Sequence, residues 1–229
     1  MTPIQRVLAT ARSENGYLEK ATNAQLEDKT ANAGYNRNKF AAFLDDLEVV
    51  YNGKKNGYAW CDCFVDYCFI YTFGLELGMA MTFQPKKGAG AGCTYSMGYY
   101  KKAGRFFKDP QPGDQIFFTN DGGASSYHTG LVEKVEGNTS SAPGVVPNGG
   151  AVRDKSYSLG YNQIAGYGRP DWSLAGEETE EMTQDQFNDM FKVAMAAYRA
   201  ELQDNDCGSY SAEGRQFMID KGLMVGGNP

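Results

Sequence analysis

The segment Tyr58-Ala59-Trp60-Cys61-Asp62-Cys63-Phe64-Val65 opens a long apolar stretch, and it decides how the fold is interpreted. Nearly every position from Cys61 to Phe73 is apolar or aromatic, which is typical of a helix buried on most sides. Gly74 suits the C-terminal cap of such a helix. The pattern therefore places Cys61 at a helix start, where free backbone N–H groups and the helix dipole favour an anion such as a thiolate.

The single histidine, His128, begins a strand-like pattern, His128-Thr129-Gly130-Leu131-Val132. A thiol is mostly protonated at neutral pH, and it becomes an effective nucleophile when an imidazole and a helix N-terminus favour the thiolate. A cysteine at a helix start and a histidine at a strand start are the combination found in papain-like thiol hydrolases. We therefore interpret the chain as an enzyme, although the spacing alone leaves a core role for Cys61 open. For Cys63 and Cys68 we expect the core role.

A zinc site made of Cys61, Cys63 and His128 is disfavoured by helical geometry. Residues two apart on a helix point about 200° away from each other, so the two cysteines cannot both face one metal. A second pair of zinc ligands is also missing from the sequence. We expect no metal and no other cofactor.

The composition limits the partners of this chain. Its 229 residues carry a net charge of -6, which argues against partners held mainly by charge, such as nucleic acid or an anionic membrane. No stretch approaches the ~20 apolar residues of a membrane span, and the start lacks the features of a secretory signal. Five cysteines, three of them crowded together, favour a reducing compartment. We therefore expect synthesis in a reducing cytoplasm without a signal peptide, and no membrane insertion.

The order of the expected elements predicts an α+β fold in which N-terminal helices pack on an antiparallel sheet. Thr2 and Gln5 form a capping box for a first helix. After the Gly88–Gly92 run the residue pattern changes to one typical of strands, so we expect strands in that part of the chain. Further helices are predicted over 40–47 and 61–73, and strands over 115–118, 128–135, about 150–158 and 163–168.

The chain is expected to divide into a catalytic domain, residues 1–172, an acidic linker, 173–181, and a helical tail, 182–229. Thr183 and Gln186 form a capping box for one tail helix, and a second helix is expected from Ser211 to about Lys221. Two short helices can bury little core, so the tail must dock on something or belong to a larger module.

Several motifs, in order, resemble those of the CHAP domain, a cysteine- and histidine-dependent amidohydrolase/peptidase family related to the NlpC/P60 peptidases. The resemblance covers roughly residues 3–172 and implies a papain-like fold acting on peptidoglycan, most often in phage endolysins or autolysins. The motifs are Trp60-Cys61-Asp62-Cys63-Phe64-Val65, Pro112-x-Asp114-Gln115-Ile116-Phe117-Phe118, His128-Thr129-Gly130-Leu131-Val132, Glu136-Gly137-Asn138-Thr139 and Gly166-Tyr167-Gly168-Arg169-Pro170.

The resemblance also assigns roles to single residues. It implies that Cys61 is the nucleophile and His128 the base, and that Glu136 and Asn138 orient or polarise the histidine. Some relatives bind calcium upstream of the nucleophile, but residues 52–58 lack the carboxylates for this, so we expect none. The tail is similar to the first part of an S-layer-homology-like repeat and could be a truncated wall-binding module.

The third catalytic residue is open. An unbroken strand would place Glu136 on the order of 26 Å from His128, at ~3.3 Å per residue. Either the strand breaks before Val135, or a hairpin usual in the family is missing from this sequence. If Gly137 instead lies in a tight turn, the returning strand brings Asn148 roughly opposite His128. We keep Glu136 and Asn138 on the strength of the motif, with Asn148 as the alternative.

These observations predict a peptidoglycan hydrolase that cuts an amide bond, as an N-acetylmuramoyl-L-alanine amidase or an endopeptidase. A groove containing Tyr58, Trp60 and Tyr127 is expected to hold the glycopeptide. Two alternatives are a non-catalytic wall-binding module and a thiol protease acting on proteins.

Overall fold

The computed structural model forms two compact units, Met1–Glu178 and Thr179–Pro229. The residues it describes are 1–30, 34–48, 50–85, 90–133, 136–139, 150–158, 160–176, 188–189, 191–196 and 209–223, without the side chains of 136–139 and 209–212. The first unit has the predicted α+β architecture, with helices early in the chain and an antiparallel sheet later. Within the described ranges, no helix is long and apolar enough to cross a membrane.

Two predicted N-terminal helices are present. Helix α1 spans Pro3–Ser13 and begins with the expected capping box, because Thr2 Oγ1 accepts the N–H of Gln5 and Gln5 Oε1 accepts the N–H of Thr2. Helix α2 spans Lys39–Asp46, and its buried face packs on the next helix. Between them lies a loop with a short 3₁₀ helix, η1, Asn23–Gln25.

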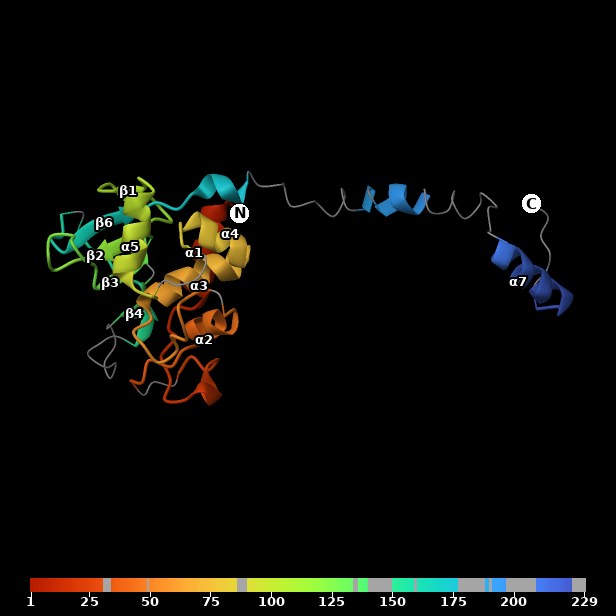
Figure 1. The fold of residues 1–229 in the computed structure, drawn as a ribbon, viewed down its shortest axis with the longest axis horizontal. Coiled ribbons are helices and arrows are strands. Elements are labelled where there is room, and N and C mark those ends of the chain that lie inside the picture. Colours follow the sequence, from red (N-terminus) through yellow and green to blue (C-terminus); the bar gives the residue numbers. More distant parts are fainter. Residues whose placement is uncertain are drawn as a thin grey trace. The chain divides into compact units, whose positions relative to one another are not determined.

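Helix α3, Cys61–Phe73, is the centre of the first unit (Figure 1). Its residues from Cys61 to Ile70 are all buried, as the apolar run predicts. Gly74 ends the helix with a φ of 83°, a left-handed value that glycine adopts without strain. Helix α4, Leu75–Met81, follows directly and packs against α3; Gly78 lies so close to Ile70 that a Cβ there would be 2.8 Å from its backbone.

The main sheet has the strand order β1-β6-β2-β3, and all its described pairs are antiparallel. Phe118 lies opposite His128 in the β2–β3 register, and this is the last residue pair of the β2–β3 ladder. The histidine therefore lies at one end of these two strands. A register irregularity between Phe117 and Phe118 interrupts the β2–β6 pairing. The strands are β1 Phe106–Phe107, β2 Gln115–Phe118, β3 His128–Leu131 and β6 Ile164–Gly168.

The predicted strand over 128–135 is too long. Strand β3 ends at Leu131 and the chain turns at Val132 and Glu133, so the first of our two alternatives, a break before Val135, is correct. Strand β4, Glu136–Thr139, pairs instead with β5, Ala151–Arg153, in a separate two-stranded sheet. The strand expected over about 150–158 is thus limited to three residues.

The strands expected directly after Gly88–Gly92 are wrong, because Cys93–Lys102 form helix α5. Its buried residues recur at helical spacing: Cys93, Ser96, Met97 and Tyr100. Lys101 and Lys102 lie in the last turn, where positive charge suits the helix dipole. The tyrosines of this segment favour a strand by propensity, but the 3.6-residue period of burial prevails.

Asp114 links the turn before β2 to strand β6 through hydrogen bonds. Its buried carboxylate accepts two hydrogen bonds from Arg169, from Nε and Nη2, each at 3.0 Å, and a third from the N–H of Gln111. This bidentate pair joins the turn before β2 to the end of β6.

The first unit ends with the 3₁₀ helix η2, Trp172–Ala175. Trp172 packs on Phe69 with ring centroids 5.5 Å apart, and Ala175, which lies in the expected linker, also packs against the core. In the second unit, residues 188–189 and 191–196 are helical, and helix α7, Ser209–Asp220, confirms the second tail helix. The capping box at Thr183 and Gln186 lies outside the described residues.

Candidate active site

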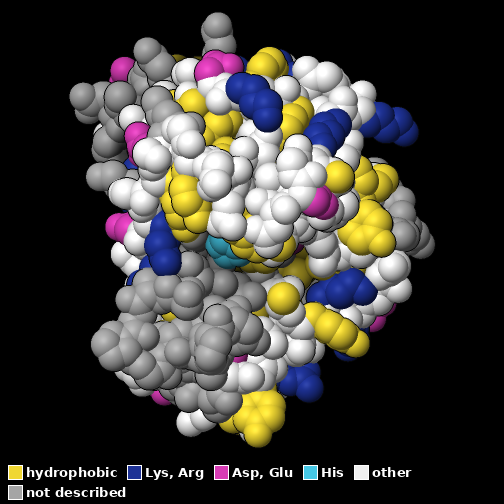
Figure 2. All heavy atoms as spheres, turned by 90° about the vertical axis from the view of Figure 1, so that its left-hand side faces the viewer, with side chains coloured by type: hydrophobic (Ala, Val, Ile, Leu, Met, Phe, Trp, Pro, Cys, Tyr) yellow, Lys and Arg dark blue, Asp and Glu magenta, His cyan; other side chains and the backbone are white. Residues whose placement is uncertain are grey.

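Cys61 and His128 are brought together by the junction of α3 with the main sheet. Cys61 is the first residue of α3, and its side chain is 6% exposed. His128 is the first residue of β3, which packs beside α3, and the two side chains form a hydrogen bond. Figure 2 shows the histidine in a hollow of the surface, so His128 faces a recess that is open to solvent.

The environment of Cys61 favours the thiolate. A hydrogen bond from the Cys93 thiol is the largest cause that holds the pKa of Cys61 well below its ordinary value of 9.0. The hydrogen bond with His128, the charge of His128 and the backbone N–H of Thr129 lower this pKa further, and together they outweigh the effect of burial. A lowered pKa increases the share of the thiolate, which is the nucleophilic form of a cysteine.

Cys93 is the residue of this site that the sequence analysis missed. It is the first residue of α5, and its Sγ lies 3.3 Å from Cys61 Sγ. Because His128 and Thr129 also stabilise negative charge on Cys61, we assign Cys93 as the donor of this S–H···S bond. The bond and burial raise the pKa of Cys93 well above 9.0. The sequence signal that could have identified Cys93 is its position directly after Gly92, the N-cap of α5. Like Cys61, it is a cysteine at the start of a helix.

A buried polar network fixes the elements that carry these residues. Asp62, beside Cys61 on α3, accepts hydrogen bonds from Ser96 Oγ of α5 at 2.9 Å and from Gln115 Nε2 of β2 at 3.2 Å. Gln115 Nε2 also donates to Thr129 Oγ1 of β3 at 3.0 Å. The network thus joins α3, α5, β2 and β3, which present Cys61, Cys93 and His128.

The carboxyl groups of α3 are unusually basic. Burial raises the pKa of Asp62 well above 3.8, and the nearby Asp66 and Cys61 raise it further. Burial also raises the pKa of Asp66 to about 7, although the hydroxyl of Tyr51 donates to Asp66 Oδ2 at 2.6 Å. Two carboxyls one helical turn apart in a dry interior disfavour the charged form.

Cys63 and Cys68 are core residues, as expected. Both are fully buried in the hydrophobic cluster formed with α1, α2 and α4, whereas Cys61 belongs to a separate cluster with Cys93. Burial raises the pKa values of both thiols well above 9.0, so neither is activated. The geometric argument against a zinc site is consistent with this separation.

The expectation that Trp60 lines the substrate groove is wrong. Trp60 is fully buried, packs on Phe40 with ring centroids 5.4 Å apart, and donates from Nε1 to Glu19 Oε2 at 3.1 Å. These contacts fix the position of the chain just before Cys61. Tyr58 and Tyr127 are 66% and 50% exposed, so they stay candidates for substrate contact.

Aromatic side chains surround His128 on the sheet. Its ring stacks on Phe118 with centroids 5.6 Å apart, and Phe118 also contacts Tyr127 and Tyr157. The stacking limits the orientations of the imidazole and leaves it partly exposed. The stacking on Phe118 fixes the position of His128 on the sheet.

Glu136 and Asn138 lie in β4, whose backbone packs beside α3 and β3. Their side chains, and the whole of Asn148, are outside the part of the chain that the structure describes. The choice among these three as the partner of His128 therefore stays a prediction.

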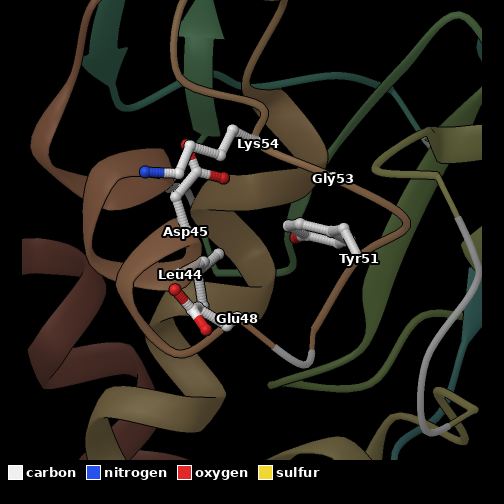
Figure 3. Close-up of a pocket in the computed structure, with 6 residues that line it drawn as sticks. All are labelled: Leu44, Asp45, Glu48, Tyr51, Gly53 and Lys54. Carbon is white, nitrogen blue, oxygen red and sulfur yellow. The ribbon is translucent and has the colours of Figure 1, made fainter.

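An open pocket of about 270 Å³ lies between the end of α2 and the loop that follows it (Figure 3). Its walls are Leu44, Asp45, Glu48, Tyr51, Gly53 and Lys54. Asp45 Oδ1 and Oδ2 accept the N–H groups of Lys55 and Asn56 at 2.7 and 2.9 Å, so this carboxylate holds the loop that leads to Cys61. Among the described side chains, no three His, Cys, Asp or Glu residues are grouped so that they could hold a metal.

Comparison with known proteins agrees with this geometry. Residues 53–142 match the CHAP domain, a family of cysteine- and histidine-dependent amidohydrolases and peptidases that typically act on peptidoglycan. The match covers less than half of the chain; it includes Cys61, His128, Glu136 and Asn138 and excludes Asn148. No curated protein and no solved structure matches the chain.

Proposed function

We propose that this protein is a peptidoglycan hydrolase that cleaves an amide bond with Cys61 as the nucleophile and His128 as the general base and acid. The observation that carries the proposal is the hydrogen-bonded pair of Cys61 and His128 at the junction of α3 and β3, within a segment that matches the CHAP domain. The bond is either the muramoyl–L-alanine amide or a peptide bond of the stem or cross-bridge.

The proposed reaction has two stages. In the first, the Cys61 thiolate attacks the amide carbonyl, and the imidazolium of His128 protonates the leaving amine as the C–N bond breaks. This leaves a thioester on Cys61. In the second, neutral His128 takes a proton from water, the water attacks the thioester, and the carboxylic acid is released with the thiol restored.

The start of α3 stabilises the charge that develops on the carbonyl oxygen. The N–H of Cys61 lies at a helix N-terminus, so we assign it as a donor to the oxyanion. Glu136 or Asn138 is proposed to orient the imidazole from β4. Tyr58 and Tyr127 are proposed to contact the glycopeptide, because both are exposed.

The proposal places the chemistry in residues 1–172 and gives the C-terminal residues 182–229 a role outside it. We propose that the protein is made in a bacterial cytoplasm and reaches the wall after release, as an endolysin or autolysin does. Cleavage of soluble peptidoglycan fragments by residues 1–178 at the full-length rate supports this division. A well-folded 1–178 fragment that is inactive on soluble fragments contradicts it.

The test of the function is digestion of purified cell walls by the full-length chain, followed by mass spectrometry of the released fragments. New L-alanine N-termini on stem peptides indicate an amidase, and shortened stems or opened cross-bridges indicate an endopeptidase. The Cys61→Ala variant is the control. Binding to walls without release of fragments contradicts the hydrolase and supports a binding module, and cleavage of casein but not of walls supports a thiol protease.

A further inference from the structure

The nucleophile has a second thiol in direct contact. Cys61 and Cys93 are the first residues of α3 and α5, and their sulfur atoms are 3.3 Å apart in a cluster that is separate from Cys63 and Cys68. A disulfide bond is ~2.0 Å long, so a movement on the order of 1 Å brings the two sulfurs to bonding distance.

We propose that Cys61 and Cys93 form a reversible disulfide that switches the nucleophile off when the protein meets a hydroperoxide. The role of Cys61 as nucleophile rests on the proposed function, but the disulfide does not require it. Cys93 is then the resolving thiol for an oxidised Cys61, and the pair is a modification site.

The two thiols differ in the way that such a reaction requires. Cys61 is the more acidic, since His128, the N–H of Thr129 and the Cys93 thiol all stabilise its thiolate, and thiolates react with peroxides. Cys93 stays protonated, so it is the weaker target for peroxide, and it is already in contact with the oxidised sulfur.

The chemistry balances with one peroxide. The Cys61 thiolate attacks the O–O bond of hydrogen peroxide, which gives the sulfenic acid Cys61–SOH and hydroxide. The Cys93 sulfur then attacks Cys61, the S–O bond breaks, and the Cys93 proton leaves with the oxygen as water. Two equivalents of an external thiol reduce the disulfide and restore both cysteines.

Access favours reaction at this pair. Cys61 lies beside His128, which is in the hollow in Figure 2, so a small oxidant approaches from the side where the substrate is expected. Cys63 and Cys68 are fully buried in the helical core and belong to a different hydrophobic cluster from Cys61. An oxidant that enters from the hollow therefore meets Cys61 first. The fifth cysteine, Cys207, lies outside the described residues.

The test is a peroxide titration of the reduced full-length protein, followed by tryptic digestion without reductant. The expected product joins peptide 56–86, which contains Cys61, to peptide 88–101, which contains Cys93, with the loss of two hydrogens. It should form in Cys63→Ala and Cys68→Ala, the matched controls, and be absent in Cys61→Ser and Cys93→Ser. Wild-type wall lysis should fall in parallel and return with dithiothreitol.

The variant that separates a switch from simple damage is Cys93→Ser. Without a resolving thiol, the sulfenic acid proceeds to the irreversible sulfinic acid. We expect the fraction of its own starting activity that dithiothreitol restores to be at least several-fold lower than in the wild type.

Mass spectrometry keeps the two proposals separable. If the 56–86/88–101 product forms in a protein that does not lyse walls, the disulfide stands and the proposed function fails. If folded wild-type protein lyses walls but peroxide gives sulfinic acid at Cys61 and no such product, the disulfide proposal is overturned.

Discussion

Cys61 and Cys63 are two residues apart on the same helix, yet they lie in regions of opposite character. Cys61 faces α5 and the main sheet, where a second thiol, a histidine and a backbone N–H surround its sulfur. Cys63 faces the helical core, where burial raises the pKa of its thiol well above 9.0. One side of α3 is built for reactivity and the other for packing.

The difference shows that helix position alone does not make a thiol reactive. Cys63 is also in the first turn of α3, where the helix dipole favours an anion, but desolvation and the two nearby carboxyls oppose the charge. The hydrogen bonds from other elements decide the outcome for Cys61. The variants below test this contrast between the two sides of the helix.

Removal of the Cys61 sulfur should have the largest effect. Cys61→Ala is expected to lower wall lysis on the order of 10³-fold or more, as for loss of a covalent nucleophile. Cys63→Ala and Cys68→Ala should retain activity and lose about 1–2 kcal/mol of stability through small core cavities. The measurements are turbidity loss of purified walls and urea unfolding. Near-wild-type lysis by folded Cys61→Ala would contradict the cysteine mechanism.

Asp66 is also a buried residue of α3, and its raised pKa should make the stability of the protein depend on pH. Its pKa is raised from 3.8 to about 7, so the folded state holds a proton that the unfolded state has already lost. The contribution of Asp66 to stability is therefore fully present below about pH 4 and is lost as the pH rises to about 7, by roughly 4 kcal/mol.

Asp66→Asn keeps an acceptor for the Tyr51 hydroxyl and removes the titration. The measurement is the free energy of unfolding in urea from pH 4 to pH 8, with Asp45→Asn as a control, because Asp45 lies in the loop-holding contact instead. We expect the curve of Asp66→Asn to be flatter than that of the wild type. An equally steep fall in both proteins would assign the pH dependence to other groups.

The partner of His128 completes the reactive side, and three variants identify it. We expect Glu136→Gln or Asn138→Ala to lower kcat roughly 10²-fold, because the imidazole loses its orienting hydrogen bond. Asn148→Ala should have little effect. The reverse pattern, with loss in Asn148→Ala and none in Asn138→Ala, would make Asn148 the third residue.

The smallest effects are expected at exposed aromatic residues. Tyr58→Ala and Tyr127→Ala should raise KM for soluble glycopeptides a few-fold, consistent with about 1 kcal/mol per contact, and leave kcat nearly unchanged. Trp60→Phe is the contrasting variant on the packing side: it should lower the unfolding midpoint and not KM. A KM change confined to Trp60→Phe would place the substrate elsewhere.

Local patterns were sufficient for much of the fold. The capping box of α1, the apolar run of α3 with Gly74 at its end, and the strands at 115–118 and 163–168 depend on neighbouring residues, and all four were predicted correctly. Helix α5 was missed because the chain was expected to turn to strands after the Gly88–Gly92 run, although Cys93, Met97 and Tyr100 already had helical spacing.

The sequence by itself determined that Cys61 begins a buried helix and that His128 begins a strand, because caps, turns and hydrophobic periods are local properties. Only the tertiary structure decided that Cys93 contacts Cys61 and that Trp60 is a core residue. Cys93 is 32 positions from Cys61 in sequence, and Trp60 is buried by Tyr17 and Phe40 from earlier elements. The local pattern does not contain these contacts, because they arise when separate elements pack around α3.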